Sequence, residues 1–225
     1  SKSIDGLIYH SSWQKEYYCK YYPWIVEKSY FIPFGIDPSI LERTPHIDYR
    51  EFEKDKPYML CVGKSRCDWD TVVEAYEGIN TPVRLCFLGG EDNKFKQKRN
   101  VAMLPYVSFG EMLDLISHAL FCILPIENVK FSFGQIRLLQ QMAMGKCVII
   151  PKAISLIDYG IDGVSTIFYK PQDVDSCRSA IQNVLADINY AEKIGARAHE
   201  EVYNKFTEEI MALQIEEVIE QLMFQ

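Results

Sequence analysis

Several features that would mark other classes of protein are missing from this sequence. No apolar run reaches the roughly 18 residues that a membrane-spanning helix needs, and no signal-peptide pattern opens the chain. The excess of positive charge that favours nucleic acid is also missing, because the formal net charge is −7. These absences argue against a membrane-spanning protein, and against bulk electrostatic attraction to nucleic acid or acidic membranes.

Cysteine and histidine occur without the spacings that define common sites. The seven cysteines form no C-x-x-C pair, and several fall in predicted buried strands. This pattern indicates a reducing compartment instead of a disulfide framework, so the predicted location is the cytoplasm. The four histidines are scattered along the chain, which supports neither a zinc site nor a catalytic triad.

The order of apolar patterns predicts an α/β protein. Hydrophobic residues make up 48% of the 225 residues, enough to bury a sizeable core. From residue 58 onward, strand patterns alternate with helical patterns, which is typical of a Rossmann-like, doubly wound parallel sheet. Right-handed crossovers then bring the loops after the strands to one edge. We expect strands at 4–9, 29–32, 58–62, 83–88, 101–104, 120–124, 147–150 and 166–169, and helices at 11–22, 69–79, 108–119, 136–144, 174–187, 191–205 and 207–223.

The stretch 131–151, FSFGQIRLLQQMAMGKCVIIP, predicts the centre of a functional site. Apolar runs at 120–125 and 147–150 enclose it, so the unit is strand, loop, helix and strand. The loop ends at Gly134-Gln135, where a helix begins that Gly145 ends. Such a helix presents free N–H groups and its positive dipole end to the carboxyl edge of the sheet, a favourable place for phosphate. Gly134 would allow a close approach of the backbone, although a simple tight turn is the alternative.

Several stretches together resemble one family in their order and spacing. Residues 32–37, IPFGID, resemble the hinge signature of retaining glycosyltransferases of family 4, which have the two-Rossmann GT-B fold. Residues 58–63 and 87–90 resemble the first two strands of the donor-binding domain in that family. Residues 134–146 resemble its most diagnostic helix, in the subgroup with GQ before LLEAMAMGKPV, and residues 158–173 resemble the next segment. The resemblance covers essentially the whole chain.

This resemblance implies the C-terminal half of a GT-B glycosyltransferase. Residues 1–37 would be the end of an N-terminal domain with the hinge, 38–57 a polar, proline-punctuated linker, and 58–225 the Rossmann-like domain that binds a nucleotide-sugar donor. The rest of the N-terminal domain, or a partner subunit, would bind the acceptor. The first residue is Ser1 in place of Met, which leaves open whether the chain is a short natural protein or a piece of a longer one.

The resemblance also implies a reaction and a set of residues. Such enzymes move a sugar from a nucleoside diphosphate to a glycan, lipid or small-molecule acceptor, with retention and without a metal or other cofactor. Gly134 and Gln135 would hold phosphate through backbone groups, Lys64 or Arg66 would neutralise the leaving group, and Gln140 would contact the ribose. The other positions expected at the donor site are Gly63, Tyr106, Val107, Ser132 and Phe133.

Three positions depart from the family pattern. Gln140 stands where the family has a glutamate that clasps the ribose hydroxyls, and an amide lacks the charge that strengthens such bonds. The first glutamate of the family falls at about Ser132, and Glu127 in the same loop could replace it. Cys67 stands where the subgroup has an arginine. Gln140 and Glu127 are therefore the only candidates for a catalytic role in this chain.

Several of these residues also have an ordinary structural interpretation. Lys64 and Arg66 could only solvate a loop, Gln140 could face solvent, and Tyr106 could stack on a base or lie on the surface. Residues 68–70, Asp-Trp-Asp, spell the Asp-x-Asp of metal-dependent transferases of another fold. They stand at a predicted helix start, where carboxylates cap the N-terminus, so we reject a metal site there.

A basic run in the chain raises the question of a membrane partner. Its residues are typical of a solvated face, and the alternative is a contact at the periphery of a membrane where lipid-linked acceptors reside. No nucleic acid partner is expected. The residues of this run are Lys94, Lys96, Lys98 and Arg99.

Two functions from different classes remain at this point. The first is the donor-binding domain of a glycosyltransferase, and the second is a catalytically silent GT-B-like module that binds nucleotide weakly or serves as a partner subunit. Titration with nucleoside diphosphates would separate the two. If the donor site is live, replacing Gln140 by glutamate is expected to strengthen binding.

Overall fold

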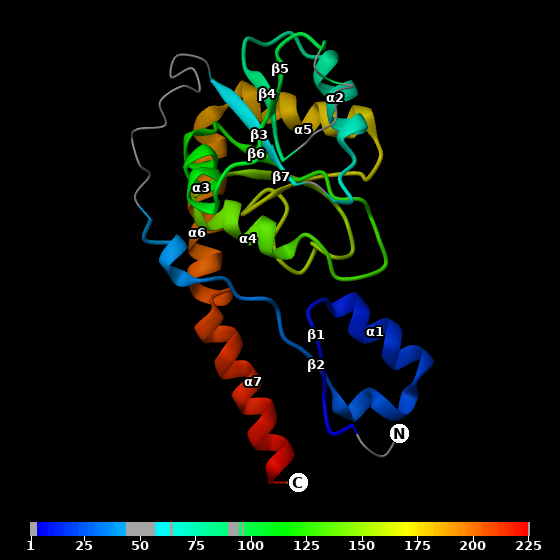
Figure 1. Ribbon diagram of the computed structural model, residues 1–225. Coiled ribbons are helices and arrows are strands. Elements are labelled where there is room, and N and C mark those ends of the chain that lie inside the picture. Colours follow the sequence, from blue (N-terminus) through cyan, green and yellow to red (C-terminus); the bar gives the residue numbers. More distant parts are fainter. Residues whose placement is uncertain (1–3, 44–56, 64, 90–94, 96, 225) are drawn as a thin grey trace.

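The computed structural model of the protein describes residues 4–43, 57–63, 65–89, 95 and 97–224. Its centre is a sheet of six strands in the order β5-β4-β3-β6-β7-β8 (Figure 1). Every neighbouring pair in this sheet is parallel. The strands are β3 (Tyr58–Val62), β4 (Arg84–Leu88), β5 (Val101–Leu104), β6 (Cys122–Ile123), β7 (Val148–Pro151) and β8 (Ile167–Tyr169).

The strand order reverses between β3 and β6. The chain moves outward from β3 through β4 to β5, then returns to the other side of β3 and continues through β7 to β8. In open parallel sheets, the loops at such a reversal separate and leave a crevice outside the carboxyl ends of the strands, where ligands bind. Residues 63 and 65–68 after β3 and residues 124–134 after β6 form this part of the molecule.

Helices cover both faces of the sheet. The sequence of β3 requires this cover, since all five of its residues are buried and successive side chains pack into two different cores, one on each face. Leu60 packs in the core that α3 and α4 cover, while Cys61 packs in the core that α2 and α5 cover, and α6 contributes to both. The helices are α2 (Trp69–Glu77), α3 (Phe109–His118), α4 (Gln135–Ala143), α5 (Val174–Ala186), α6 (Ile188–Lys205) and α7 (Glu208–Met223).

The N-terminal residues form a separate small layer. β1 (Leu7–Tyr9) pairs in parallel with β2 (Ser29–Phe31), and α1 (Ser12–Tyr21) with the 3₁₀ helix η1 (Pro23–Lys28) connects them. A second 3₁₀ helix, η2 (Pro38–Ile40), follows. In Figure 1, α7 leaves the six-stranded sheet and runs toward the end of the molecule that holds β1 and β2. Backbone bonds join the two regions, because Glu208 donates to Ile36 O at 3.0 Å.

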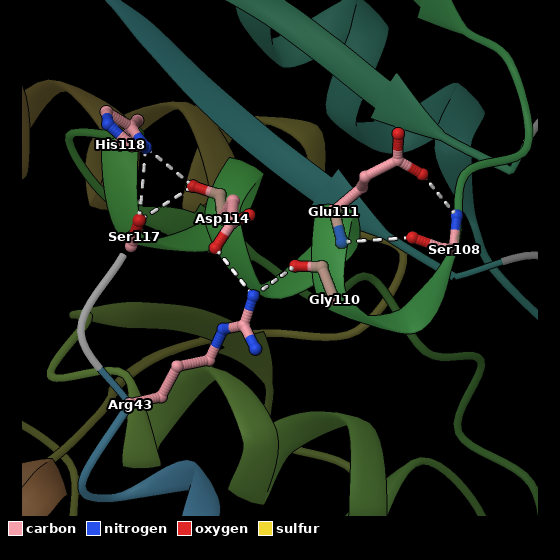
Figure 2. A network of polar contacts seen from close by, with 7 residues as sticks. All are labelled: Arg43, Ser108, Gly110, Glu111, Asp114, Ser117 and His118. Carbon is pink, nitrogen blue, oxygen red and sulfur yellow. Dashed lines mark hydrogen bonds and ion pairs between the residues drawn. The ribbon is translucent and has the colours of Figure 1, made fainter. Parts of the chain in front are cut away.

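A polar network fastens the segment after η2 to α3 (Figure 2). Arg43 Nη2 donates to Asp114 Oδ1 at 2.9 Å and to Gly110 O at 3.2 Å. At the start of α3, Ser108 and Glu111 form the reciprocal bonds of a capping box, as their spacing predicts. His118 at the other end bonds through Nδ1 to Asp114 O at 2.7 Å. This part of the predicted linker is therefore anchored to the helix layer.

The predicted fold class is confirmed, and the predicted elements differ from the observed ones mainly at their ends. Strands 58–62 and 101–104 are found as expected. α6 begins at Ile188 instead of 191, because Asp187 accepts from Tyr190 N at 3.0 Å and caps the helix earlier than the apolar pattern suggests. Within the described ranges, no helix is both long and apolar enough to span a bilayer. The domain division at 37 and 57 stays a prediction, and residues 44–56 of the expected linker lie outside the described part.

Candidate functional site

A cavity of about 530 Å³ lies at the carboxyl edge of the sheet, where the strand order reverses. The loop after β3 contributes Gly63 and Ser65, and the segment after β6 contributes Ile126. The first turn of α4 and the loop before it form another wall. Phe34, from the segment that resembles a hinge, also lines the cavity and stacks on the His10 ring with centroids 3.8 Å apart. The predicted positions Gly63, Ser132, Phe133, Gly134, Gln135 and Gln140 all line it.

A second cavity, of about 280 Å³, continues along the same edge toward β4 and β5. Tyr106 and Val107 line it, as does Gly89 at the end of β4. The Tyr106 side chain is 54% exposed, so this ring is both a surface residue and part of a cavity wall. Gly63 and Arg137 line both cavities. The two cavities therefore form one elongated site along the carboxyl edge of the sheet.

The N-terminus of α4 borders the larger cavity, and Arg137 in its first turn also borders the smaller one. Gly134 is the N-cap with a φ of 87°, and the first bond within the helix runs from Leu138 N to Gly134 O at 3.0 Å. The N–H groups of Gln135, Ile136 and Arg137 precede that bond and have no acceptor within the helix. Because these three residues line the cavity, their N–H groups and the positive end of the helix dipole form a suitable environment for an anion.

The structure changes the reason for the glycine at position 134. A Cβ added there would lie 2.9 Å from Ile126 Cγ1 and 3.5 Å from Leu156 Cδ2, so the missing side chain leaves room for protein neighbours. The positive φ is a second reason, since most side chains disfavour it. Packing and conformation therefore require a glycine here even without a ligand, and a close approach of the Gly134 backbone to a phosphate stays a prediction.

The two glutamines of the predicted site have different environments. Gln135 is only 2% exposed, and its Nε2 donates to Ser132 Oγ, which ties the loop before α4 to the helix. Gln140 is 8% exposed and lines the larger cavity, so the alternative in which it faces solvent is wrong. Its Oε1 accepts a hydrogen bond from Arg137 Nη1 at 2.9 Å. A contact between Gln140 and a ribose stays a prediction.

Arg66, one of the two cations predicted near the leaving group, and Glu127, the possible replacement for the first glutamate of the family, form an exposed pair. Arg66 Nη1 lies 3.4 Å from Glu127 Oε2, with side-chain exposures of 58% and 41%. The backbone holds these two residues together, because Glu127 N donates to Arg66 O at 2.8 Å. Neither residue is among the described residues that line the two cavities above. Lys64 lies outside the described residues, so a role for either cation at the leaving group stays a prediction.

Cys67 has a structural role in the loop after β3. It forms an isolated antiparallel bridge with Ile126, and the neighbouring Asp68 donates from its backbone to Pro125 O at 2.7 Å. Burial raises the pKa of the Cys67 thiol to about 11, so this side chain is neutral near pH 7 and supplies no charge. A Cβ at Gly63 would lie 2.7 Å from the Cys67 sulfur, which shows how tightly this loop packs.

Sequence reasoning missed one charged residue of the site, Arg137. Its neighbour Ile136 is apolar, yet this side chain is 47% exposed and lines the cavity. Arg137 is half-buried and lines both cavities. The available signal was its position three residues before Gln140, since residues three apart are neighbours on a helix surface.

Several acidic and basic residues outside the two cavities cap helices or form ion pairs within the protein. Asp68 caps α2, accepting from Thr71 N at 3.2 Å, so the cap predicted there is confirmed, and Asp173 caps α5 in the same way, accepting from Ser176 N at 2.9 Å. Lys98 of the basic run pairs with Glu77 at 2.8 Å, while Lys94 and Lys96 lie outside the described residues. All seven cysteines are free. Across the described residues, no cluster of three or more His, Cys, Asp or Glu could hold a metal ion.

A parallel sheet with helices on both faces and a cavity at the strand reversal defines the class of the protein. This architecture matches the C-terminal domain of GT-B glycosyltransferases. The family described as Glycosyl transferases group 1 matches residues 56–187, more than half of the chain. The protein therefore belongs to the glycosyl transferases group 1 family. No curated protein sequence gives a significant match.

Several solved structures share this fold. Sucrose-phosphate synthase from Thermosynechococcus elongatus is 24% identical, with a TM-score of 0.78 over 96% of this chain and 58% of that chain. Anabaena HepE in complex with UDP-glucose is 15% identical, with a TM-score of 0.81 over 96% of this chain and 64% of that chain. The C-terminal domain of LpcC from Francisella tularensis is 14% identical, with a TM-score of 0.62 over 77% of this chain and 100% of that chain. The chain thus spans less than two thirds of the first two proteins, and at these identities the likeness concerns the fold.

Proposed function

We propose that the protein is the donor-binding part of a retaining, family 4 glycosyltransferase. It would bind a nucleoside-diphosphate sugar and transfer the sugar to a glycan, lipid or small-molecule acceptor. The acceptor would be held by an N-terminal GT-B domain or a partner subunit. The observation that carries the proposal is the elongated site, whose larger cavity is lined by the N-terminus of α4. HepE, which shares the fold, was solved with UDP-glucose bound.

The shape of the site suggests how a donor would lie in it. The base would occupy the smaller cavity beside Tyr106 and Val107, and the diphosphate would lie at the N-terminus of α4. The sugar would occupy the larger cavity, where Phe34 and Ser132 form part of the wall. A volume of about 530 Å³ is within the usual range of small-molecule sites, which is roughly 300 to 1,000 Å³.

The proposed chemistry is cleavage of the bond between the sugar and the diphosphate. As that bond breaks, negative charge develops on the leaving diphosphate, and the acceptor oxygen forms the new bond to the sugar with net retention. The free N–H groups of α4 would stabilise the developing charge, in the way that preoriented donors do at other oxyanions. No metal or other cofactor is part of the proposal, and the acceptor side belongs to the rest of the enzyme.

Calorimetric titration of the chain with uridine, guanosine and adenosine diphosphates tests the donor site. We expect one of them to bind with a Kd in the micromolar range and the corresponding nucleoside to bind much more weakly, because it lacks the diphosphate. If none of the three binds, the donor site is not functional, and a silent partner module becomes the better description. Addition of the complete enzyme's N-terminal domain, followed by an assay of sugar-nucleotide hydrolysis, then tests turnover.

The orientation of the donor has a test of its own. Replacing Tyr106 by alanine should weaken nucleoside diphosphate binding by roughly 5- to 100-fold, because stacking of a base on an aromatic ring contributes about 1–3 kcal/mol. Tyr203, which is 64% exposed on α6, provides the matched control, and its replacement by alanine should leave the Kd unchanged. If the two variants bind the nucleoside diphosphate with equal affinity, the base does not lie in the smaller cavity beside Tyr106.

A further inference from the structure

Arg137 occupies the junction of the two cavities. It is the third residue of α4, so its side chain originates in the same turn that carries the free N–H groups. It lines the larger cavity beside Ser132 and the smaller one beside Met112 of α3. Arg137 therefore lines the same cavity as the first turn of α4, where the positive end of the helix dipole lies.

The partners of this guanidinium are neutral. Its Nη1 donates to Gln140 Oε1 at 2.9 Å and to the Met112 sulfur at 2.7 Å. In the described part of the chain, Arg137 forms no ion pair, and its Nε and Nη2 groups have no hydrogen-bond acceptor. Burial lowers the pKa of the guanidinium, and no neighbouring charge contributes to that shift. A half-buried cation with only neutral partners is costly, and an anion beside it would relieve the cost.

The free edge of the guanidinium matches a phosphate. The Nε and Nη2 donors of an arginine form a planar fork that binds two oxygens of a phosphate at once. Because Nη1 is held by Gln140 and Met112, the orientation of this fork is fixed before a ligand arrives. We propose that Arg137 binds the diphosphate of the donor at the junction of the two cavities, with Gln140 as the residue that positions it. This inference rests on the proposed donor site.

The pairing also explains the amide at position 140. A glutamate there would be three residues from Arg137 on one helix surface and would form an ion pair with it. That carboxylate would neutralise the guanidinium and repel a diphosphate. Gln140→Glu is therefore expected to weaken diphosphate binding, which reverses the expectation drawn from the family pattern alone.

The test compares four forms of the chain by calorimetry with the nucleoside diphosphate that the wild type binds and with the matching nucleoside. Arg137→Gln should raise the Kd for the diphosphate roughly 10- to 100-fold, since a hydrogen bond to a charged group contributes about that much to binding. Its Kd for the nucleoside should stay unchanged. Gln140→Glu should also raise the Kd for the diphosphate. Arg197→Gln removes the same charge from an exposed position on α6 and should change the Kd less than twofold.

Each outcome separates the inference from the proposed function. If the wild type binds no nucleoside diphosphate, the proposed function and this inference both fail. If the wild type binds a nucleoside diphosphate and the two variants Arg137→Gln and Arg197→Gln bind it with the same Kd, the proposed donor site stands. The role proposed for Arg137 is then wrong. Thermal unfolding shows whether each variant is folded. Should Arg137→Gln fail to fold, Gln140→Glu decides alone, and an affinity equal to or above that of the wild type would overturn the inference.

Discussion

At the scale of single residues, glycine fixes the geometry at the N-terminus of α4. Gly134 begins the helix with a φ of 87°, and Gly145 follows its end with a φ of 69°. Gly145 N donates to Met142 O and Lys146 N donates to Gln141 O, the paired bonds of a Schellman motif. The two glycines share a left-handed backbone but differ in packing, because a Cβ at Gly145 would meet nothing within 4 Å.

This difference predicts unequal costs for the same substitution. Gly145→Ala should lower the free energy of unfolding by about 1 kcal/mol, the cost of a left-handed alanine. Gly134→Ala should lower it by about 2–4 kcal/mol, because the new methyl group would also be overpacked against Ile126 at 2.9 Å. Urea unfolding of both variants measures the two values, and Ile126→Ala should reduce the extra cost at position 134. Equal losses for the two glycines would contradict this explanation.

The residue scale is also where prediction from sequence reaches its limit. The helical period places Gln140 on the same face of α4 as the start of the helix, which is enough to predict that Gln140 faces the site. The bond from Arg137 to Met112 joins α4 to α3, and a contact between two helices cannot be read from either pattern. The resemblance implies a role for Arg66 at the leaving group, and its observed ion pair with Glu127 depends in addition on how the loop after β6 packs.

At the scale of elements, local capping accounts for most of what could be predicted. Asp68, Ser108 and Asp173 all cap helices where their spacing indicates, because a cap needs only residues within one turn. The central strands were equally clear, since strands buried on both faces have continuous apolar runs. The start of α6 at Ile188 is harder to predict, because the single residue Asp187 is both the C-cap of α5 and the N-cap of α6.

The capping box of α3 predicts a dependence of stability on pH. The pKa of Glu111 is lowered in the folded protein, mainly by a hydrogen bond with the Ser108 side chain and to a smaller extent by one with the Ser108 backbone. The stabilisation by ionised Glu111 is therefore fully present above the pKa that this carboxyl has in the unfolded protein. It is lost as the pH falls through the lower pKa of the same carboxyl in the folded protein. The difference in unfolding free energy between wild type and Glu111→Gln should shrink as the pH is lowered from about 6 to about 3.5.

Urea unfolding across this pH range measures that difference. Glu216→Gln is the matched control, because it removes a carboxylate from an exposed position on α7 that makes no capping bond. A Glu111→Gln difference that is independent of pH, or that grows at low pH, would show that the capping bonds do not favour the ionised form of Glu111.

At the scale of the whole molecule, one buried tyrosine joins the N-terminal layer to the site. Tyr159 is fully buried, and its hydroxyl donates to His10 O at 2.6 Å and accepts from Phe34 N at 2.9 Å. Ser12 adds a bond to Asp158 Oδ1 at 2.6 Å. Since Phe34 lines the larger cavity, these bonds connect β1 and the segment after β2 to the proposed sugar end of the site.

Loss of the Tyr159 hydroxyl should loosen this connection. Tyr159→Phe would leave the partly buried carbonyl of His10 and N–H group of Phe34 without this partner, so the free energy of unfolding should fall by about 1–3 kcal/mol. Hydrogen exchange at the Phe34 amide should also become faster. Tyr203→Phe, on the exposed face of α6, should change the free energy by less than about 0.5 kcal/mol. Unchanged protection at Phe34 would mean that other contacts hold this segment.

The central claim is that the N-terminus of α4 binds the diphosphate of a nucleotide sugar. It is tested most directly by NMR, from the changes in backbone amide shifts when a saturating nucleoside diphosphate is added. The account predicts the largest changes at Gln135, Ile136 and Arg137, whose N–H groups would donate to phosphate oxygens, and small ones at Gly145 and Lys146 at the other end of the helix. Binding that shifts other amides and leaves those three unchanged would contradict it.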